Sequence, residues 1–382
     1  MRKHIAAVLA SIALFAGIAA CGSGTGGSRQ VPIDGGSPTA PTGSGPITLS
    51  PPRPVSPVNG AQLSTLRPTL TVENSTSSQS GTRTYEFQVS DRTDFSLGAS
   101  LAASFLVAVN QTGVAEGAGG RTTFEVPSDL QPTTRMYWRV RSVQGSSASD
   151  WSSPTTFKTK LVGYSRGGEL YDPLIHGETI GTIEGAHTWI AGSGLRLETQ
   201  NSFVRYRLAE PIANGEFSVE VEGLHPNGPS HKLKIFSMSD TTGDTTDSRF
   251  QMSTMYRGIP GNPDNCIAFK AVFGSQSRIV EPDLSARRAG IRFLDPSKIY
   301  FWKATWGSEF RLMVAEGGVS GSTIYELGLP ASGSYNPSPA YAYLGTNQSL
   351  FGSDAGTFPG ATYRHLWIGN RPRPDSLGSA LD

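Results

Sequence analysis

The sequence predicts an all-β protein built from two β-sandwich domains of unequal size. Short runs rich in Val, Ile, Thr, Phe, Tyr and Trp recur along the chain, and Gly, Pro, Asn or Asp residues separate them. Beyond the apolar N-terminus, no stretch repeats its apolar residues with the helical period of 3.6. Turn-forming residues are abundant, with 45 Gly and 26 Pro in 382 residues, as a chain of many short strands requires.

The N-terminus has the charge and apolar pattern of an export signal. Arg2 and Lys3 precede an apolar stretch, Ile5–Ala20, which has the length of a signal peptide and is short for a membrane span. The stretch ends in Ile-Ala-Ala followed by Cys21, which resembles the bacterial lipobox. The resemblance implies that Cys21 carries lipid and anchors the protein to the cell envelope. The next residue is not acidic, which favours the outer membrane or cell surface. The alternatives are an ordinary secretory signal and an uncleaved anchor.

The composition of residues 22–56 predicts a flexible tether. They are rich first in Gly and Ser and then in Pro, with few large apolar side chains. Such a segment cannot bury enough surface to fold. The tether would lift the folded part of the protein clear of the lipid headgroups.

The chain has two cysteines, and Cys21 would be used by the lipid. Cys266 would then remain alone, so neither an internal disulfide nor a cysteine-based metal site is expected. We expect Cys266 to be a small buried apolar residue.

Residues 57–160 predict the smaller sandwich. Its candidate strands are 69–72, 84–89, 102–109, 122–126, 136–143 and 155–157. PVNG, TYEFQVS and MYWRVRSV followed by ASDWSSPTTFKT resemble, in this order, segments of bacterial fibronectin type III domains. That family usually has Trp on the second strand, where Leu70 and Val72 stand here, so we expect Trp138 to fill the core. The resemblance implies a spacer or a protein-contact module.

Residues 161–382 predict the larger sandwich, a two-sheet jelly roll. Its candidate strands are 194–197, 203–208, 216–221, 231–238, 250–256, 266–273, 289–294, 299–306, 310–315, 323–327, 341–344 and 363–369. The segments GSGLRLETQNSFVRYRL, NGEFSVEVEGL, IYFWKATWGSEFRLMVAEGG and YRHLWIGNRPRP resemble successive parts of the concanavalin A-like lectin/glucanase family, which includes laminin G-like domains. That family usually adds a closing strand, which here is short or lies beyond the sequence.

Two apolar runs around Gly307-Ser308 predict a β-hairpin over residues 299–315. If these two residues form the loop, Trp302 pairs with Met313, and alternation gives the hairpin two faces. The face expected to meet the core carries Phe301, Lys303, Thr305, Phe310, Leu312 and Val314. The other face carries Tyr300, Trp302, Ala304, Trp306, Glu309, Arg311 and Met313.

The second face of this hairpin predicts a sugar-binding platform. The C–H face of a sugar stacks on aromatic rings while its hydroxyls bond polar groups. The predicted ligand-binding residues are Tyr300, Trp302, Trp306 and Arg311, with Tyr256 and Arg257 from a Gly/Pro-rich loop at 255–265. The alternatives are that a loop or the second sheet covers the aromatic face, or that the register shifts by one residue.

Glu220 and Glu222 are the weak candidates for a catalytic pair. They alternate correctly on one strand, and glycoside hydrolysis needs two carboxylates. The Glu-x-Asp-x-x-Glu pattern that glucanases of this fold carry is incomplete, however, and solvent-facing strand residues are the alternative. The Gln-x-His strand of jelly-roll lyases and a Gly-x-Ser-x-Gly elbow are both absent.

Asp240, Asp244 and Asp247 are the weak candidates for a calcium site. They lie in a loop between strands, and oxygen-rich loops bind calcium in laminin G-like domains. Their spacing does not match an EF-hand, and a plain polar turn is the alternative. No other cofactor is expected.

The charge balance argues against nucleic acid as a partner. With 32 basic and 31 acidic residues the net charge is +1, so the chain has no general attraction to phosphate. A local basic set could meet an acidic polysaccharide or form a solvated rim; it consists of Arg278, Arg287, Arg288, Arg292, Arg364, Arg371 and Arg373.

The sequence therefore predicts a cell-envelope lipoprotein whose larger sandwich binds extracellular or cell-wall carbohydrate without catalysis. One alternative is a carbohydrate-active enzyme that uses a pair such as Glu220 and Glu222. The other is a structural or protein-contact module of the envelope.

Overall fold

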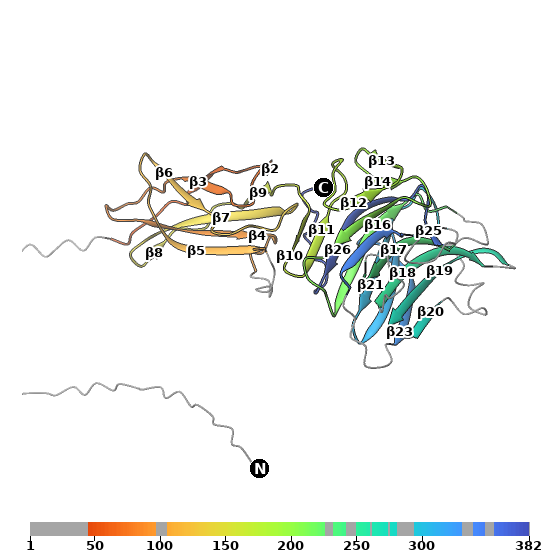
Figure 1. Ribbon diagram of the computed structural model, residues 1–382. Coiled ribbons are helices and arrows are strands. Elements are labelled where there is room, and N and C mark those ends of the chain that lie inside the picture. The colour runs from red at the N-terminus through yellow and green to blue at the C-terminus, as the bar shows by residue number, and fades with distance from the viewer. Residues whose placement is uncertain are drawn as a thin grey trace, which may run out of the picture. The chain divides into compact units, whose positions relative to one another are not determined.

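The structure is a computed structural model in which contacts divide the chain into two compact units, Met1–Gly45 and Pro46–Asp382. The described residues are 45–96, 105–225, 232–241, 250–259, 262–273, 276–280, 294–330, 339–347 and 355–381. The predicted export signal, Cys21 and most of the predicted tether lie outside them. All regular elements in the described ranges are strands (Figure 1), and these ranges contain no helix long and apolar enough to cross a membrane. The predicted fold class is confirmed in its architecture: the described residues are all-β and form a smaller β-sandwich followed by a larger one of two sheets.

The smaller sandwich consists of two sheets. One has the order β1-β3-β6, formed by β1 (Arg53–Ser56), β3 (Thr69–Glu73) and β6 (Arg121–Glu125). The other has the order β2-β9-β7-β4-β5, with β8 paired to β7. Its strands are β2 (Ala61–Gln62), β4 (Thr84–Ser90), β5 (Ala108–Ala115), β7 (Arg135–Gln144), β8 (Ser147–Ala148) and β9 (Thr155–Lys158).

Trp138 lies at the centre of this sandwich. It is fully buried in a cluster with Leu70 and Val72, and its indole N–H donates to the carbonyl of Pro57 at 2.7 Å. The prediction that Trp138 fills the core of this sandwich is therefore confirmed.

Two boundaries of the smaller sandwich differ from the prediction. The predicted tether ends in β1, where Pro54 pairs with Val72 of β3. β1 is an edge strand, and an edge tolerates proline because no ladder hydrogen bond is lost on its open side. The strand predicted at 102–109 is displaced toward the C-terminus, since β5 begins at Ala108; residues 97–104 lie outside the described ranges.

The larger sandwich packs a nine-stranded sheet against an eight-stranded one. The first sheet has the order β10-β11-β26-β16-β21-β22-β23, with β13 and β14 attached at β26. Its strands are β10 (Tyr164–Arg166), β11 (Glu169–Asp172), β13 (His187–Ile190), β14 (Gly194–Leu197), β16 (Gly215–Glu222), β21 (Tyr300–Trp306), β22 (Glu309–Glu316), β23 (Ser322–Pro330) and β26 (Thr362–Gly369).

The second sheet has the order β12-β15-β24-β17-β18-β19-β20, with β25 paired in parallel to β17. Its strands are β12 (Thr182–Glu184), β15 (Phe203–Arg207), β17 (Lys232–Ser239), β18 (Phe250–Ile259), β19 (Asn262–Phe273), β20 (Gln276–Val280), β24 (Tyr341–Gly345) and β25 (Ala355–Thr357). The two sheets share one apolar core, in which the rings of Phe217 and Phe236 stack with centroids 3.9 Å apart.

The predicted register of the β21–β22 hairpin is wrong by one residue. Thr305 pairs with Arg311, and Trp302 pairs with Val314 rather than with Met313. Gly307 in the loop has a φ of +146°, a conformation that side chains disfavour. Because side chains alternate, the corrected register puts Trp302 on one face with Leu312 and Val314.

The aromatic face of β21 is the core face. Tyr300, Trp302 and Trp306 are 1%, 0% and 3% exposed and belong to the core cluster of the larger sandwich. The opposite face carries Lys303 and Thr305, which are partly exposed. The assignment of the two faces in the sequence prediction is therefore wrong for β21.

We expect Trp302→Ala to lower the free energy of unfolding by about 3–5 kcal/mol, because it leaves a large cavity in a closely packed core. Trp302→Phe should cost less, since the indole N–H has no hydrogen-bond partner among the described residues. Urea denaturation followed by circular dichroism measures both changes. Arg311→Ala is the control and should stay within about 0.5 kcal/mol. A Trp302→Ala protein as stable as the parent would contradict the buried assignment.

Candidate functional site

The structure does not bring the predicted platform residues together at a surface. The Trp306 indole N–H donates to the Ile212 carbonyl at 2.7 Å, and the Tyr300 hydroxyl accepts from the Asp295 amide at 2.8 Å, so both polar ends already have partners. Arg311 points to the opposite face, 54% exposed, where Glu309 and Glu326 hold it at 3.0 and 2.8 Å. A sugar cannot stack on rings inside the core, so we do not retain these residues as a platform.

Tyr256 and Arg257 lie within β18 rather than in a loop. They pair with Ile267 and Cys266 of β19. The predicted loop is therefore shorter than expected, because the ladder continues through it. The side chains of Tyr256, Arg257 and Cys266 lie outside the described part of the structure.

The predicted calcium site falls largely outside the described ranges. Asp244 and Asp247 are not described, and Asp240 follows the end of β17. Within the described part of the chain, no group of three or more His, Cys, Asp or Glu side chains could hold a metal ion. The calcium hypothesis thus stays a prediction for this loop.

Glu220 and Glu222 do lie on one face of β16, as their spacing predicts. Both contact the same guanidinium: Arg364 Nε lies 2.9 Å from Glu220 Oε2, and Arg364 Nη1 lies 3.8 Å from Glu222 Oε2. Glu220 also accepts a hydrogen bond from the backbone N–H of Val319 at 3.2 Å. The two side chains of this ion pair are only 12% and 16% exposed, so the pair is well shielded from solvent.

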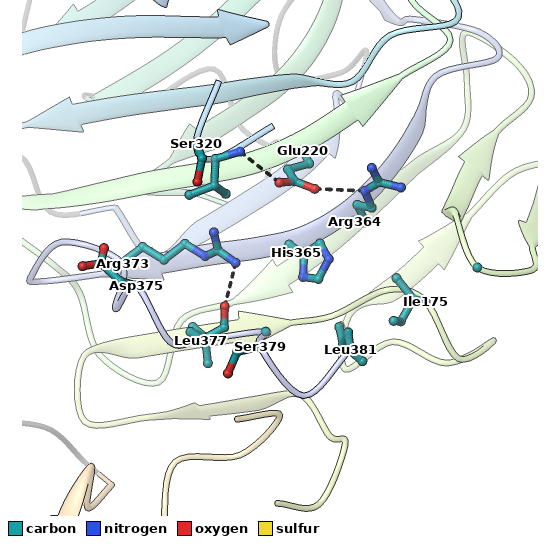
Figure 2. Close-up of a pocket in the computed structure, with 13 residues that line it drawn as sticks. Ile175, Glu220, Ser320, Arg364, His365, Arg373, Asp375, Leu377, Ser379 and Leu381 are labelled. Atoms are coloured by element: carbon teal, nitrogen blue, oxygen red, sulfur yellow. Dashed lines mark hydrogen bonds and ion pairs between the residues drawn. The ribbon is translucent and has the colours of Figure 1, made fainter. Parts of the chain in front are cut away.

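A pocket of about 410 Å³ opens beside this ion pair (Figure 2). One wall comes from β16 and β26 and another from the C-terminal segment, residues 375–381. Its polar side chains are Glu220, Ser320, Arg364, His365, Arg373, Asp375 and Ser379. The pocket therefore offers hydrogen-bond donors and acceptors and lacks an aromatic platform.

A β-bulge aims His365 at this pocket. Between the pairs Ser218–Trp367 and Glu220–Arg364, one residue of β16 faces two residues of β26. His365 is the first of the two and has a φ of +54°, which is rare for a residue other than glycine. Such strain is often found at functional positions.

Behind the pocket, three polar groups meet under Gly378. His365 Nδ1 lies 3.1 Å from the hydroxyl of Tyr171, which is fully buried. A Cβ on Gly378 would lie 3.1 Å from His365 Nδ1, 3.2 Å from the Tyr171 hydroxyl and 3.3 Å from Arg373 Nη2. Gly378 also has a φ of +94°, so glycine is required here for two reasons. Burial raises the pKa of Tyr171, and the charge of Arg373 counteracts part of the rise.

The C-terminal segment is held by the smaller sandwich. The amides of Gly378 and Ala380 donate to the carbonyl of Thr133 at 2.9 and 3.4 Å, and the Arg135 amide donates to Ser379 Oγ at 2.9 Å. An apolar cluster continues this contact and consists of Phe105, Tyr164, Tyr171, Trp367 and Leu377, with Leu66 packed against it. The smaller sandwich thus supports a wall of the pocket.

Sequence reasoning singled out Glu220 and, within a basic set, Arg364 and Arg373, but it did not group them. His365 and the serine hydroxyls of the lining were missed. Glu220 lies on β16, and Arg364 and His365 lie on β26, a strand far away in the chain. Only the pairing of these two strands brings the three side chains together.

A comparison with models of protein families finds no match, and a comparison with curated proteins finds no significant match. Among solved structures, the chain is similar to the enzymatically active domain of bacteriophage CBA120 tailspike protein 2, with a TM-score of 0.33 and 11% identity over 56% of this chain and 31% of that chain. It is also similar to the exoplasmic/lumenal domain of VIP36 bound to Ca²⁺ and Man3GlcNAc, with a TM-score of 0.34 and 10% identity over 55% of this chain and 91% of that one. The chicken CNTN1 FN1–FN3 domains give a TM-score of 0.18 and 10% identity over 74% of this chain and 69% of that chain. Likenesses at this level do not bear on function.

A buried carboxyl fixes the loop that carries Ile175 into the pocket. Asp172 is 1% exposed and accepts hydrogen bonds from the amides of Leu174 and Ile180 at 3.3 and 3.1 Å. The hydroxyls of Thr179 and Tyr206 also donate to it. Burial nevertheless raises the pKa of Asp172 to about 6, because the charged form loses its hydration.

We expect this carboxyl to make stability depend on pH. The pKa of Asp172 is higher in the folded state than its ordinary 3.8, so its stabilising contribution is complete below about pH 3.8 and is lost as the pH rises through about 6. The loss should be about 3 kcal/mol, from about two pKa units. Urea unfolding of the parent and of Asp172→Asn between pH 3.5 and 7 measures it. The difference between the two curves should change across this window, and parallel curves would contradict the raised pKa.

Proposed function

We propose that the larger sandwich binds carbohydrate in the pocket beside Glu220 and Arg364. The observation that carries the proposal is the convergence of donors and acceptors from β16, β26 and the C-terminal segment on one concavity. Sugar hydroxyls both donate and accept, so they need such a mixed lining. The volume of about 410 Å³ lies within the range of small-molecule sites.

We propose binding without catalysis. A glycosidase needs one carboxyl group on each side of the scissile bond. Glu220 and Glu222 instead lie on one face of β16 and contact one guanidinium, that of Arg364. An ion pair of this kind is better suited to orienting a fixed hydrogen-bond surface than to exchanging protons with a substrate.

The full chain, purified in detergent, should bind immobilised glycans on an array. Ser320→Trp would fill the mouth of the pocket, because Ser320 is exposed at its rim, and should lower the affinity about tenfold or more. Ser153→Trp is the matched control, since Ser153 is exposed on the smaller sandwich outside the lining, and it should bind like the parent.

The same glycans should be assayed for release of reducing ends. If the parent protein releases reducing ends and Glu220→Gln does not, the protein is an enzyme and the proposal of binding without catalysis is wrong. If the folded chain binds no glycan, the remaining hypothesis is that it is a structural or protein-contact module of the envelope.

We further propose, from the sequence, that the protein is exported and anchored through lipid on Cys21 to the outer membrane or cell surface. The support is the position of Cys21 directly after an apolar stretch that ends in small residues. Cells grown with an alkyne-labelled fatty acid should yield labelled protein in the membrane fraction. Cys21→Ser should remove the label and release the protein from that fraction. Label retained by Cys21→Ser would contradict the assignment.

A further inference from the structure

The two cationic side chains of the pocket differ in how their charges are compensated. Arg364 is held by Glu220 and Glu222 and has little charge to offer a ligand. Arg373 has no ion-pair partner within the described ranges, where its Nε is buried without a hydrogen-bond partner. Its Nη2 donates to the carbonyl of Leu377 at 2.9 Å, a bond that fixes the guanidinium without neutralising it.

The Arg373 guanidinium is also presented to the pocket in a fixed orientation. Figure 2 shows its side chain reaching into the cavity between Ser320 and Leu377, while the Asp375 carboxylate points away from it. The Arg373 amide donates to Glu216 Oε1 at 3.3 Å, so the backbone is held as well as the side chain. A guanidinium held in this way loses little further entropy when it binds a ligand.

We propose that the ligand of this pocket is an acidic sugar whose carboxylate binds Arg373. This inference rests on the proposed carbohydrate-binding function and names the class of sugar. The guanidinium of Arg373 is charged, and a charge-assisted hydrogen bond from it to a carboxylate is about twice as strong as one to a neutral hydroxyl.

The charges of the lining favour a ligand with a single negative charge at this position. Arg373 is the one cation of the described lining without an ion-pair partner, whereas the exposed Asp375 opposes further negative charge. A carboxylate satisfies this condition. Ser320, Ser379 and His365 also line the pocket and would lie beside the ring hydroxyls of such a sugar.

The test compares each uronic acid oligosaccharide with its own carboxyl-reduced form, in which a primary alcohol replaces the carboxylate. Short oligomers of galacturonate, glucuronate and mannuronate are titrated into the full chain in detergent, and the affinity is measured by calorimetry. At least one acidic form should bind about tenfold or more tightly than its reduced counterpart.

Arg373→Gln should lower the affinity for the acidic form to that of the reduced form. Arg311→Gln removes the same charge from an exposed site on β22, outside the pocket, and should keep the preference. The comparison of the two sugars on the parent protein decides the matter even if Arg373→Gln does not fold.

The two proposals fail in different ways. If reduced or neutral glycans bind at the pocket and no acidic form binds better, the acidic-sugar inference is wrong and carbohydrate binding stands. If neither form binds and the glycan array is also silent, both proposals are wrong. If Arg311→Gln also removes the preference for the acidic sugar, the preference arises from general attraction between charges. That result would overturn the role of Arg373.

Discussion

The bulge in the ladder between β16 and β26 is the constraint on which the site depends. Along an unbroken strand, Tyr363, residue 365 and residue 367 would share one face. The extra residue shifts the alternation, so Tyr363, Leu366 and Ile368 all face the core, while Arg364 and His365 line the pocket. The left-handed backbone of His365 is the cost of this shift, of the order of 1 kcal/mol. The close packing of β26 with three neighbouring strands offsets it.

The alternation of residue types predicted the fold well because each strand buries one face. Register was harder, and the β21–β22 hairpin shows why. Gly307, Ser308 and Glu309 are compatible with a loop of either two or three residues, and nothing local distinguishes them. A shift of one residue exchanges the partners of every side chain, so Trp302 was grouped with charged residues instead of with Val314. An error in one loop thus produced an apparent binding platform from part of the core.

The candidate site was less predictable because it is assembled from distant segments. The spacing of Glu220 and Glu222 correctly placed both on one face of β16. Their common partner Arg364, however, comes from a strand about 140 residues later, and only the sheet topology relates the two. Loops such as the one that carries Asp172 and the segment after β26 have no periodicity from which their positions could be inferred.

The dependence of one pocket wall on the smaller sandwich changes how that domain is understood. A spacer needs only to hold the larger sandwich away from the membrane. Here Thr133 and Arg135 bind the backbone and side chains of the C-terminal segment, and Gly378 of that segment closes over Tyr171 and His365. Because packed elements transmit displacement, a shift of Thr133 would move the wall against His365 and change the volume of the pocket. The geometry of the candidate site therefore depends on both sandwiches, because the smaller one holds the C-terminal segment that forms a wall of the pocket.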